Sequence, residues 1–406
     1  MTHITPNTTN SAIIIAMKQY EVATTTSGKA FIINIETKEI VSKLWSSIHL
    51  GASEYYVASN SNGQHAIFHI NNPDEPISQW WKNMYLKGLL SGESKYYLVQ
   101  NQEGQWAIFH IDNPDKPITH WWKQISAPNL LTGISQYYIA TNSSNQQAIF
   151  HKDDPDNPVS QWWKEIYVNG ITVGESDYYI ACNHDEQEAI FHINNPYEPI
   201  SQWEKSIKTS GLVQGQSDYY LVRKPNDKYA IFHINNPKEA ISKEWLKIET
   251  HGLVEGQSDY YIVKDHNWIL TAIFHKDDPD KPISNWHENI YPFGLLNNAS
   301  DCYAVYDSDT HSVHVYHPSN IFEPLYKLTK VKKRDLICFD TQLAMYLTSK
   351  QLVMYDNTIT KRRIICTLPE DMQEIVKQIR AGYNTYNINT ITSKLISQYI
   401  NYNFIP

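Results

Sequence analysis

The sequence predicts an all-β repeat protein, and three observations point to this fold class. The tetrapeptide Ala-Ile-Phe-His occurs six times, at offsets of 41 residues and, at the last step, of 42. A Tyr-Tyr pair precedes every copy and keeps the 41-residue offset throughout. These β-branched and aromatic runs flank a polar stretch, which is the pattern of two strands joined by a loop. Because four-stranded propeller blades take about 40–45 residues, we expect a seven- or eight-bladed β-propeller, with an open β-solenoid as the alternative.

Residues 1–19 precede the array and contain the apolar run AIIIAM at residues 12–17. This run has six residues and no basic residue before it, so it is too short and wrongly flanked for a secretory signal or a membrane span. We expect a lead-in strand here. The cysteines are scattered without a Cys-x-x-Cys pair, which is typical of a reducing compartment. We therefore expect a cytoplasmic protein, although export without a cleavable signal would leave no mark in the sequence.

The repeat array spans residues 20–366. Six clear repeats fill residues 54–298, and a shorter, degenerate repeat precedes them at residues 20–47. Eroded copies of the hairpin follow at residues 302–318 and, more weakly, at residues 343–355, as is typical of terminal repeats. The Tyr pairs begin at Tyr55, Tyr96, Tyr137, Tyr178, Tyr219 and Tyr260, and the tetrapeptides at Ala66, Ala107, Ala148, Ala189, Ala230 and Ala272.

After the hairpin, each repeat has a turn, a third element and a short closing run. Asn and Pro in residues 71–76 predict a turn where the chain leaves the sheet. Apolar residues then recur at i, i+3, i+4 and i+7 in residues 77–84, which fits a helix, although a short strand followed by a turn fits nearly as well. The closing run, such as Gly-Leu-Val at residues 211–213, lies between chain breakers and predicts a further strand.

Residues 367–406 have a helical pattern in place of the repeat. Pro369 and two acidic residues open a stretch with an apolar stripe at residues 372–379, and a second stripe at i, i+4 and i+8 follows in residues 390–400. Both stretches are amphipathic. We expect a C-terminal helical extension that packs on the end of the array, with a partner-docking tail as the alternative.

One repeat has a strand at residues 96–99, the run Gln-Trp-Ala-Ile-Phe at residues 105–109, and an Ile, aromatic, Ile close at residues 118–125. This order of motifs resembles the bacterial WG, or KWG, repeat. The resemblance covers roughly residues 20–316, with Ala in place of the glycine of the Trp-Gly step and with an added Asn-Pro turn. It implies a β-rich repeat protein of the interaction type, without a known catalytic centre, and it transfers no site residues.

Composition argues against several partners and cofactors. The formal net charge of −9 argues against a nucleic-acid binder, since neutralising phosphates requires a basic face. We expect the basic clusters at residues 327–334 and 361–363 to be solvated, not a nucleic-acid or membrane patch. The histidine that ends each tetrapeptide recurs in every copy, which favours a hydrogen bond to the following turn over a metal site. Acidic turns such as residues 153–156 contain Asn in other copies, so we expect no metal and no cofactor.

The third element contains two columns of Trp, which supply the candidate binding residues. Every copy keeps at least one Trp, as expected of a structural anchor. The second column also accepts Glu, and because unpaired charges are rarely buried, we expect this column to be at least partly exposed. The second column holds Trp81, Trp122, Trp163, Glu204, Trp245 and His287. We predict an aromatic and basic binding row formed by Trp81, Trp122 and Trp163 with the adjacent Lys82, Lys123 and Lys164.

These patterns favour a non-enzymatic protein–protein interaction scaffold. Its partner would be a protein whose identity the sequence does not give. The alternative is a multivalent carbohydrate-binding propeller, in which equivalent blade pockets each stack a glycan on Trp at near-identical sites. No catalytic motif occurs, so an enzyme with a site assembled from blade loops is the least favoured class.

Overall fold

The computed structural model describes residues 19–331, 336–347, 351–367 and 373. The predicted lead-in strand at residues 12–17 and, apart from Gln373, the two predicted C-terminal helices lie outside these residues. The chain divides into two compact units, residues 1–203 with 213–215 and residues 204–212 with 216–406. Among the described helices, none has the length and apolar character that crossing a membrane requires.

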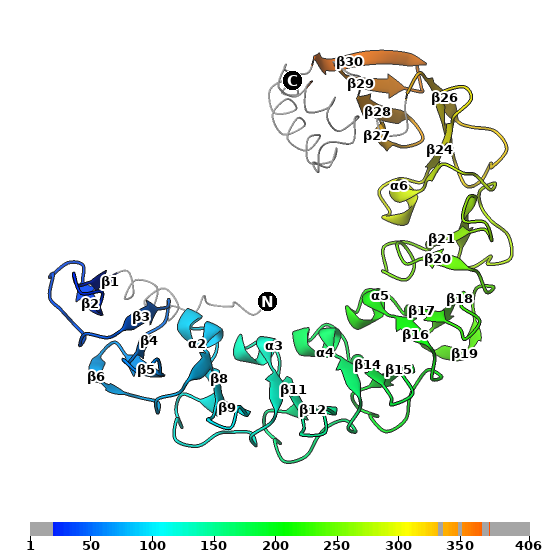
Figure 1. Cartoon of the computed structure of the whole chain (residues 1–406). Helices are drawn as coiled ribbons and strands as arrows, with labels where there is room; N and C mark the ends of the chain where they lie inside the picture. Colours follow the sequence, from blue (N-terminus) through cyan, green and yellow to red (C-terminus); the bar gives the residue numbers. More distant parts are fainter. Residues whose placement is uncertain (1–18, 332–335, 348–350, 368–372, 374–406) are drawn as a thin grey trace, which may run out of the picture. The chain divides into compact units, whose positions relative to one another are not determined.

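Both units consist of small antiparallel sheets, nine in the described part of the chain, which confirms the predicted all-β repeat class (Figure 1). We number the six clear repeats 1 to 6, starting from the Tyr pair at Tyr55. The first unit contains the degenerate repeat and repeats 1 to 4, and in it the short helices α2, α3 and α4 follow one another along the successive sheets (Figure 1). Its elements are β1 (Tyr20–Thr24), β2 (Ala30–Asn34), β3 (Ser47–Leu50), β4 (Tyr55–Ser59), β5 (His65–His69), β6 (Asn72–Pro76), β7 (Asn83–Tyr85), α2 (Lys87–Ser91), β8 (Tyr96–Gln100), β9 (Trp106–His110), β10 (Gln124–Ser126), α3 (Pro128–Leu131), β11 (Tyr137–Thr141), β12 (Gln147–His151), β13 (Glu165–Tyr167), α4 (Asn169–Val173), β14 (Tyr178–Cys182) and β15 (Glu188–His192).

The second unit contains repeats 5 and 6 and the two eroded copies, each of which forms its own sheet. The eroded hairpins predicted at residues 302–318 and 343–355 are therefore present. The elements, including α5 at the boundary of the units, are β16 (Ser206–Lys208), α5 (Ser210–Val213), β17 (Tyr219–Arg223), β18 (Tyr229–His233), β19 (Asn236–Ala240), β20 (Lys247–Glu249), β21 (Tyr260–Lys264), β22 (Thr271–His275), β23 (Ile290–Tyr291), α6 (Phe293–Leu296), β24 (Tyr303–Asp307), β25 (Ser312–Tyr316), β26 (Tyr326–Thr329), β27 (Leu336–Phe339), β28 (Leu343–Leu347), β29 (Gln351–Asp356) and β30 (Lys361–Thr367).

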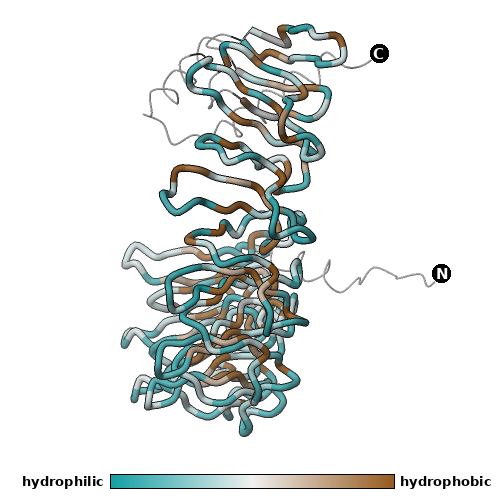
Figure 2. The backbone as a smooth tube through the Cα atoms, turned by 90° about the vertical axis from the view of Figure 1, so that its right-hand side faces the viewer, coloured by the Kyte–Doolittle hydropathy of each residue, from teal (hydrophilic) through white to brown (hydrophobic). Residues whose placement is uncertain are grey.

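Each hairpin uses its two faces for two different neighbours. In repeat 1, Tyr56 and Phe68 are buried in a cluster with Ile32 of the preceding repeat. Val57 and Ile67 lie in the cluster that contains the apolar residues of repeat 2. Successive side chains of a strand point to opposite faces, so one short run serves both neighbours. The same division recurs at other junctions within each unit, and Figure 2 shows hydrophobic residues along the strands with hydrophilic loops around them.

The third element, which the sequence left open between helix and strand, is neither. Residues 77–82 form an irregular segment with a single bridge between Trp81 and His65. The buried Ser78 hydroxyl accepts the Ile67 amide hydrogen at 2.9 Å and donates to the Gln79 carbonyl at 2.9 Å. The Ser78 hydroxyl thus takes the place of the backbone carbonyl that would accept the Ile67 amide hydrogen if a regular strand lay beside β5. The equivalent residues are Ser42, Thr119, Ser160, Ser201, Ser242 and Ser284.

The prediction of a strand in the closing run is wrong. The Gly-Leu-Leu run that closes repeat 1 forms the one-turn helix α2, and the strand β7 lies just before it. Leu89 and Leu90 are buried in the junction with the neighbouring repeat. A Cβ on Gly88 would lie 1.6 Å from the Leu131 carbonyl oxygen, so the close approach of two repeats decides the conformation here.

Candidate functional site

The predicted row of Trp81, Trp122 and Trp163 does not form an open surface. Each side chain is partly buried, with its Nε1 atom shielded from solvent. The three indole rings pack against Phe109, Phe150 and Phe191 of the following repeat, with centroids 5.7, 5.4 and 5.3 Å apart. The centroids of these three rings also lie 5.4–5.9 Å from those of the Trp in the first column of that repeat, namely Trp121, Trp162 and Trp203. These residues fill the junctions between repeats.

The inference that tolerance of Glu indicates exposure is also wrong. Glu204, which occupies the same column in repeat 4, is only 6% exposed. Its carboxylate pairs with the Lys224 ammonium at 2.5 Å, and that ammonium lies 4.7 Å from the centroid of the Phe232 ring. A buried ion pair therefore takes the place of the indole. The exposed lysines of the predicted row have separate contacts, Lys123 with Asn145 at 2.5 Å and Lys164 with Glu186 at 2.8 Å, while Lys82 is exposed.

A different set of side chains recurs at the surface, namely one Tyr and one His in every clear repeat. The first Tyr of each pair lies opposite the last His of the tetrapeptide across the hairpin, as Tyr55 does opposite His69. Both residues are partly buried, and their rings meet edge to face with centroids 4.8–5.4 Å apart. The six pairs are Tyr55 with His69, Tyr96 with His110, Tyr137 with His151, Tyr178 with His192, Tyr219 with His233 and Tyr260 with His275.

The backbone fixes the tautomer of each of these histidines. In all six repeats, Nδ1 accepts the amide hydrogen of the second residue after the His, at 3.1–3.3 Å. The predicted hydrogen bond between the histidine and the following turn is present, but its direction is opposite to the predicted one, because the turn amide donates and the imidazole accepts. A neutral imidazole that accepts at Nδ1 carries its hydrogen on Nε2. Burial lowers the pKa of His110, which favours this neutral form. Every repeat therefore presents a Tyr ring beside an Nε2 donor.

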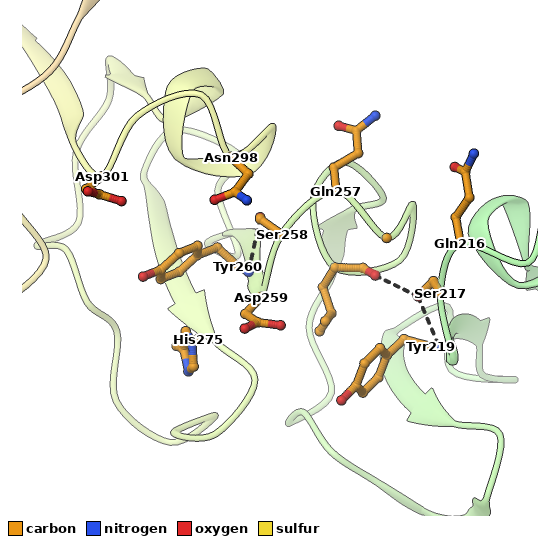
Figure 3. Close-up of a pocket in the computed structure, with 12 residues that line it drawn as sticks. Gln216, Ser217, Tyr219, Gln257, Ser258, Asp259, Tyr260, His275, Asn298 and Asp301 are labelled. Carbon is orange, nitrogen blue, oxygen red and sulfur yellow. Dashed lines mark hydrogen bonds between the residues drawn. The ribbon is translucent and has the colours of Figure 1, made fainter. Parts of the chain in front are cut away.

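Pockets lie beside these pairs in both units. In the first unit, a pocket of about 550 Å³ is lined by Ser53, Glu54 and Tyr55 of repeat 1 and by residues 91–95 of repeat 2. In the second unit, a pocket of about 410 Å³ is lined by the equivalent residues of repeats 5 and 6, with Tyr219 and Tyr260 among them (Figure 3). The serine before each Tyr accepts the Tyr amide hydrogen, as Ser217 does for Tyr219 at 3.1 Å. It also donates to a carbonyl of the next repeat in some junctions, as Ser217 does to Leu253 at 2.8 Å.

The residue between this serine and the Tyr changes from repeat to repeat. It is the one variable member of an otherwise constant set, and its charge changes along the array. The six residues are Glu54, Lys95, Gln136, Asp177, Asp218 and Asp259. In repeat 1, burial raises the pKa of the Tyr55 hydroxyl, and the Glu54 carboxylate adds to this shift.

Two other pockets, of about 800 and 520 Å³, lie beside the short strands β7, β10 and β13. The last residue of these strands is Tyr85, Ser126 or Tyr167, so their lining changes in chemical type between repeats. The Tyr–His pairs are constant, which makes their pockets the stronger candidate. Among the described residues, His, Cys, Asp and Glu do not gather in any group of three or more that would hold a metal ion.

Sequence reasoning passed over these pairs because a residue present in every copy was assigned to the stability of the repeat. The alternation of side chains along each strand could have indicated that these Tyr and His residues share one face of the hairpin. Tyr55 and His69 share the face of Val57 and Ile67, and that face meets the next repeat only along its apolar part.

Comparisons with known proteins identify no family. No family model and no curated protein matches the chain. Among solved structures, the chain is similar to Hsv2 of Kluyveromyces lactis, with 11% identity and a TM-score of 0.26 over 77% of this chain and 96% of that one. A form of KlHsv2 with loop 6CD replaced by a Gly-Ser linker gives 12% identity and a TM-score of 0.28 over 68% and 95% of the two chains. Scores this low carry no conclusion about function.

Proposed function

We propose that this chain is a non-enzymatic protein-interaction scaffold that binds a polypeptide along the edge carrying the Tyr–His pairs. One observation carries the proposal. Tyr and His recur at a fixed 41-residue spacing, or 42 at the last tetrapeptide, while the residue beside them changes from Glu to Lys, Gln and Asp. A constant aromatic and donor framework with variable charges suits a ligand whose own residues differ along its length.

The residue types fit this role. Tyr supplies a large, rigid contact area at low conformational-entropy cost, and aromatic residues are enriched at protein interfaces. The Nε2 hydrogen of the His offers a donor beside the ring, although in repeat 1 it lies 3.4 Å from the Glu54 carboxylate. Exposed carboxylates such as Asp218 accept hydrogen bonds. Pockets beside successive pairs provide concave sites for side chains of a bound segment.

The glycan alternative has less support. It requires near-identical sites in which a sugar stacks on Trp, whereas the Trp rings of the second column pack in the junctions. The pockets beside the Tyr–His pairs differ in charge from one repeat to the next.

The finer fold class is also a proposal. Face-to-face packing of successive small sheets is what propeller blades do. Nine sheets are described, so an eight-bladed ring requires the two-stranded β1–β2 sheet to share a blade with another sheet.

A parallel screen tests the function. The purified chain is applied to a random-peptide display library and to a glycan array, and the selected ligands are remeasured with variants. Replacement of Tyr55, Tyr96 and Tyr137 by Ala is expected to weaken peptide binding at least tenfold, as loss of aromatic anchors does. Replacement of the exposed Tyr85, Tyr167 and Tyr197 by Ala is the matched control and is expected to leave binding unchanged. Selection of glycans alone, or equal loss in both variants, would reject the proposal.

A further inference from the structure

In two junctions, the chain places its own lysine over the Tyr of a Tyr–His pair. The Lys152 ammonium lies 5.9 Å from the centroid of the Tyr96 ring, and the Lys276 ammonium lies 5.9 Å from that of Tyr219. Both lysines directly follow the tetrapeptide of the next repeat. Each also pairs with a carboxylate, Lys152 with Asp153 at 2.7 Å and Lys276 with Asp259 at 3.1 Å. An aromatic face with a carboxylate beside it is thus a site that this fold fills with a primary ammonium.

At the next junction of the second unit, this lysine is missing. The residue that follows the equivalent His317 is Pro318. The equivalence is secure, because Ser319 donates its amide hydrogen to His317 Nδ1 at 3.2 Å and Tyr303 stacks on Tyr316, as Tyr261 stacks on Phe274. Tyr260 therefore has the surroundings of Tyr219 without the covering lysine.

The negative charge at this junction remains in place. Asp301 and Asp259 both raise the pKa of the Tyr260 hydroxyl, after the larger effect of burial. Among the described residues, no cation forms an ion pair with the exposed Asp301, whereas Asp259 pairs with Lys276. Tyr260, His275, Asn298 and Asp301 line one end of the pocket of about 410 Å³, and Figure 3 shows Asp301 and Asn298 on one side of Tyr260 with Asp259 on the other.

We propose that the Tyr260 pocket binds a lysine side chain of the partner polypeptide, with its ammonium over the Tyr260 ring and against the Asp301 carboxylate. This inference rests on the proposed function and states that one residue of the bound polypeptide is a lysine. Within the second unit, Lys276 closes the equivalent site at Tyr219, and the site at Tyr260 is left open for a partner lysine. In the first unit Lys152 closes the site at Tyr96, whereas Ile111 and Ile193 stand in its place at the junctions of Tyr55 and Tyr137.

The test uses a pentapeptide, acetyl-Gly-Gly-Lys-Gly-Gly-amide, carrying a photoreactive diazirine, with cross-linked residues of the full chain mapped by mass spectrometry. Cross-links are expected at residues 258–260 and 298–301. A norleucine peptide, which lacks the ammonium, is expected to give several-fold fewer.

Three variants separate the site from general attraction. Pro318→Lys installs the lysine that follows the tetrapeptide in repeats 3 and 6 and is expected to abolish the cross-links at Tyr260. Lys276→Ala is expected to open the Tyr219 site and to add cross-links at residues 216–219. Asp301→Asn is expected to reduce labelling about two- to fivefold, as loss of an exposed charge partner does.

Three outcomes would overturn the inference: equal labelling by the norleucine peptide, unchanged labelling of Pro318→Lys, or no labelling of residues 258–260 and 298–301 by the lysine peptide. Each is distinguishable from failure of the proposed function. Peptides selected by display that depend on Tyr55, Tyr96 and Tyr137 would still bind if only the lysine site were wrong.

Discussion

In repeat 4, the residue of the second Trp column is replaced together with a residue that it contacts. Glu204 stands where most repeats have Trp, and Lys224 stands where repeats 1 to 4 have Asn at the hairpin turn, as Asn183 does in repeat 4. A buried carboxylate without a partner is costly, so the two replacements compensate each other. The ammonium also covers Phe232, the ring that an indole would otherwise contact.

Removing one member of this pair is expected to destabilise the chain strongly. Lys224→Ala leaves Glu204 as an uncompensated buried charge and is expected to lower the free energy of unfolding by about 3 kcal/mol. The double variant Glu204→Trp with Lys224→Asn restores the residues of other repeats and is expected to lie within about 1 kcal/mol of the natural chain. Urea denaturation of both variants measures the difference. A Lys224→Ala chain as stable as the natural one would show that the pair is solvated.

His287 is a second exception in the Trp column, and it makes stability depend on pH. Burial lowers the pKa of His287, and the nearby His314 adds to the shift. The folded state therefore binds this proton less readily than the unfolded state, so the stabilisation is present above the ordinary His pKa and is lost as pH falls.

His287→Trp is expected to remove part of this dependence. Between about pH 7.5 and about pH 5, the melting temperature of the natural chain is expected to fall further than that of the variant. His184→Gln, at an exposed position, is the control and should follow the natural chain. Parallel curves for the natural chain and His287→Trp would rule out this contribution.

At the scale of elements, contacts between repeats determine the conformation of the closing run, which the sequence pattern alone does not predict. The closing Gly-Leu-Leu run is apolar and short enough for a strand, but in α2 it turns Leu89 and Leu90 into the junction and brings Gly88 against the next repeat. The one-turn helix lacks a side-chain N-cap hydrogen bond, so packing and not capping holds it.

Gly88→Ala is expected to destabilise the first unit by about 2–3 kcal/mol, because the added methyl group would overlap the Leu131 carbonyl. Gly63→Ala is the matched control, since Gly63 has a φ of +71° but no atom within 4 Å of an added Cβ. Its cost is expected to be about 1 kcal/mol, from backbone strain alone. Thermal denaturation compares the two. Equal losses would mean that the repeats separate easily enough to accept the methyl group.

At the scale of the whole molecule, the proposed propeller requires its first and last sheets to lie near each other, because ring closure protects strand edges. Sheets packed face to face lie about 10 Å apart, so nine in a straight stack would separate the ends by about 80 Å.

Fluorescence transfer between labels at the exposed Ser27 and Thr358 measures this separation. We expect a distance of less than roughly half the value for a straight stack. Labels at Ser27 and Asn62, in adjacent repeats, provide the short-distance reference. Separation close to the full length of the stack would establish the open β-solenoid.

The sequence by itself determined the period, the two hairpin strands of every clear repeat, the degenerate copies at both ends and the histidine hydrogen bond to the turn. These features depend on short-range patterns, namely strand alternation and turn chemistry, which each repeat carries within its own 41 residues. Because six repeats share one pattern, a substitution in a single repeat does not hide the strands and turns that the other repeats indicate.

Only the tertiary structure decided the irregular third element, the helical closing run, the burial of Trp81, Trp122 and Trp163, and the surface position of the Tyr–His pairs. The burial of the Trp column and the helical closing run depend on a neighbour one repeat away, such as Phe109 against Trp81 or Leu131 against Gly88. The third element depends on side chains such as Ser78, which bonds to Ile67 across its own repeat. A periodic pattern shows which side chains share a face, but the exposure of that face depends on how closely the next repeat packs against it.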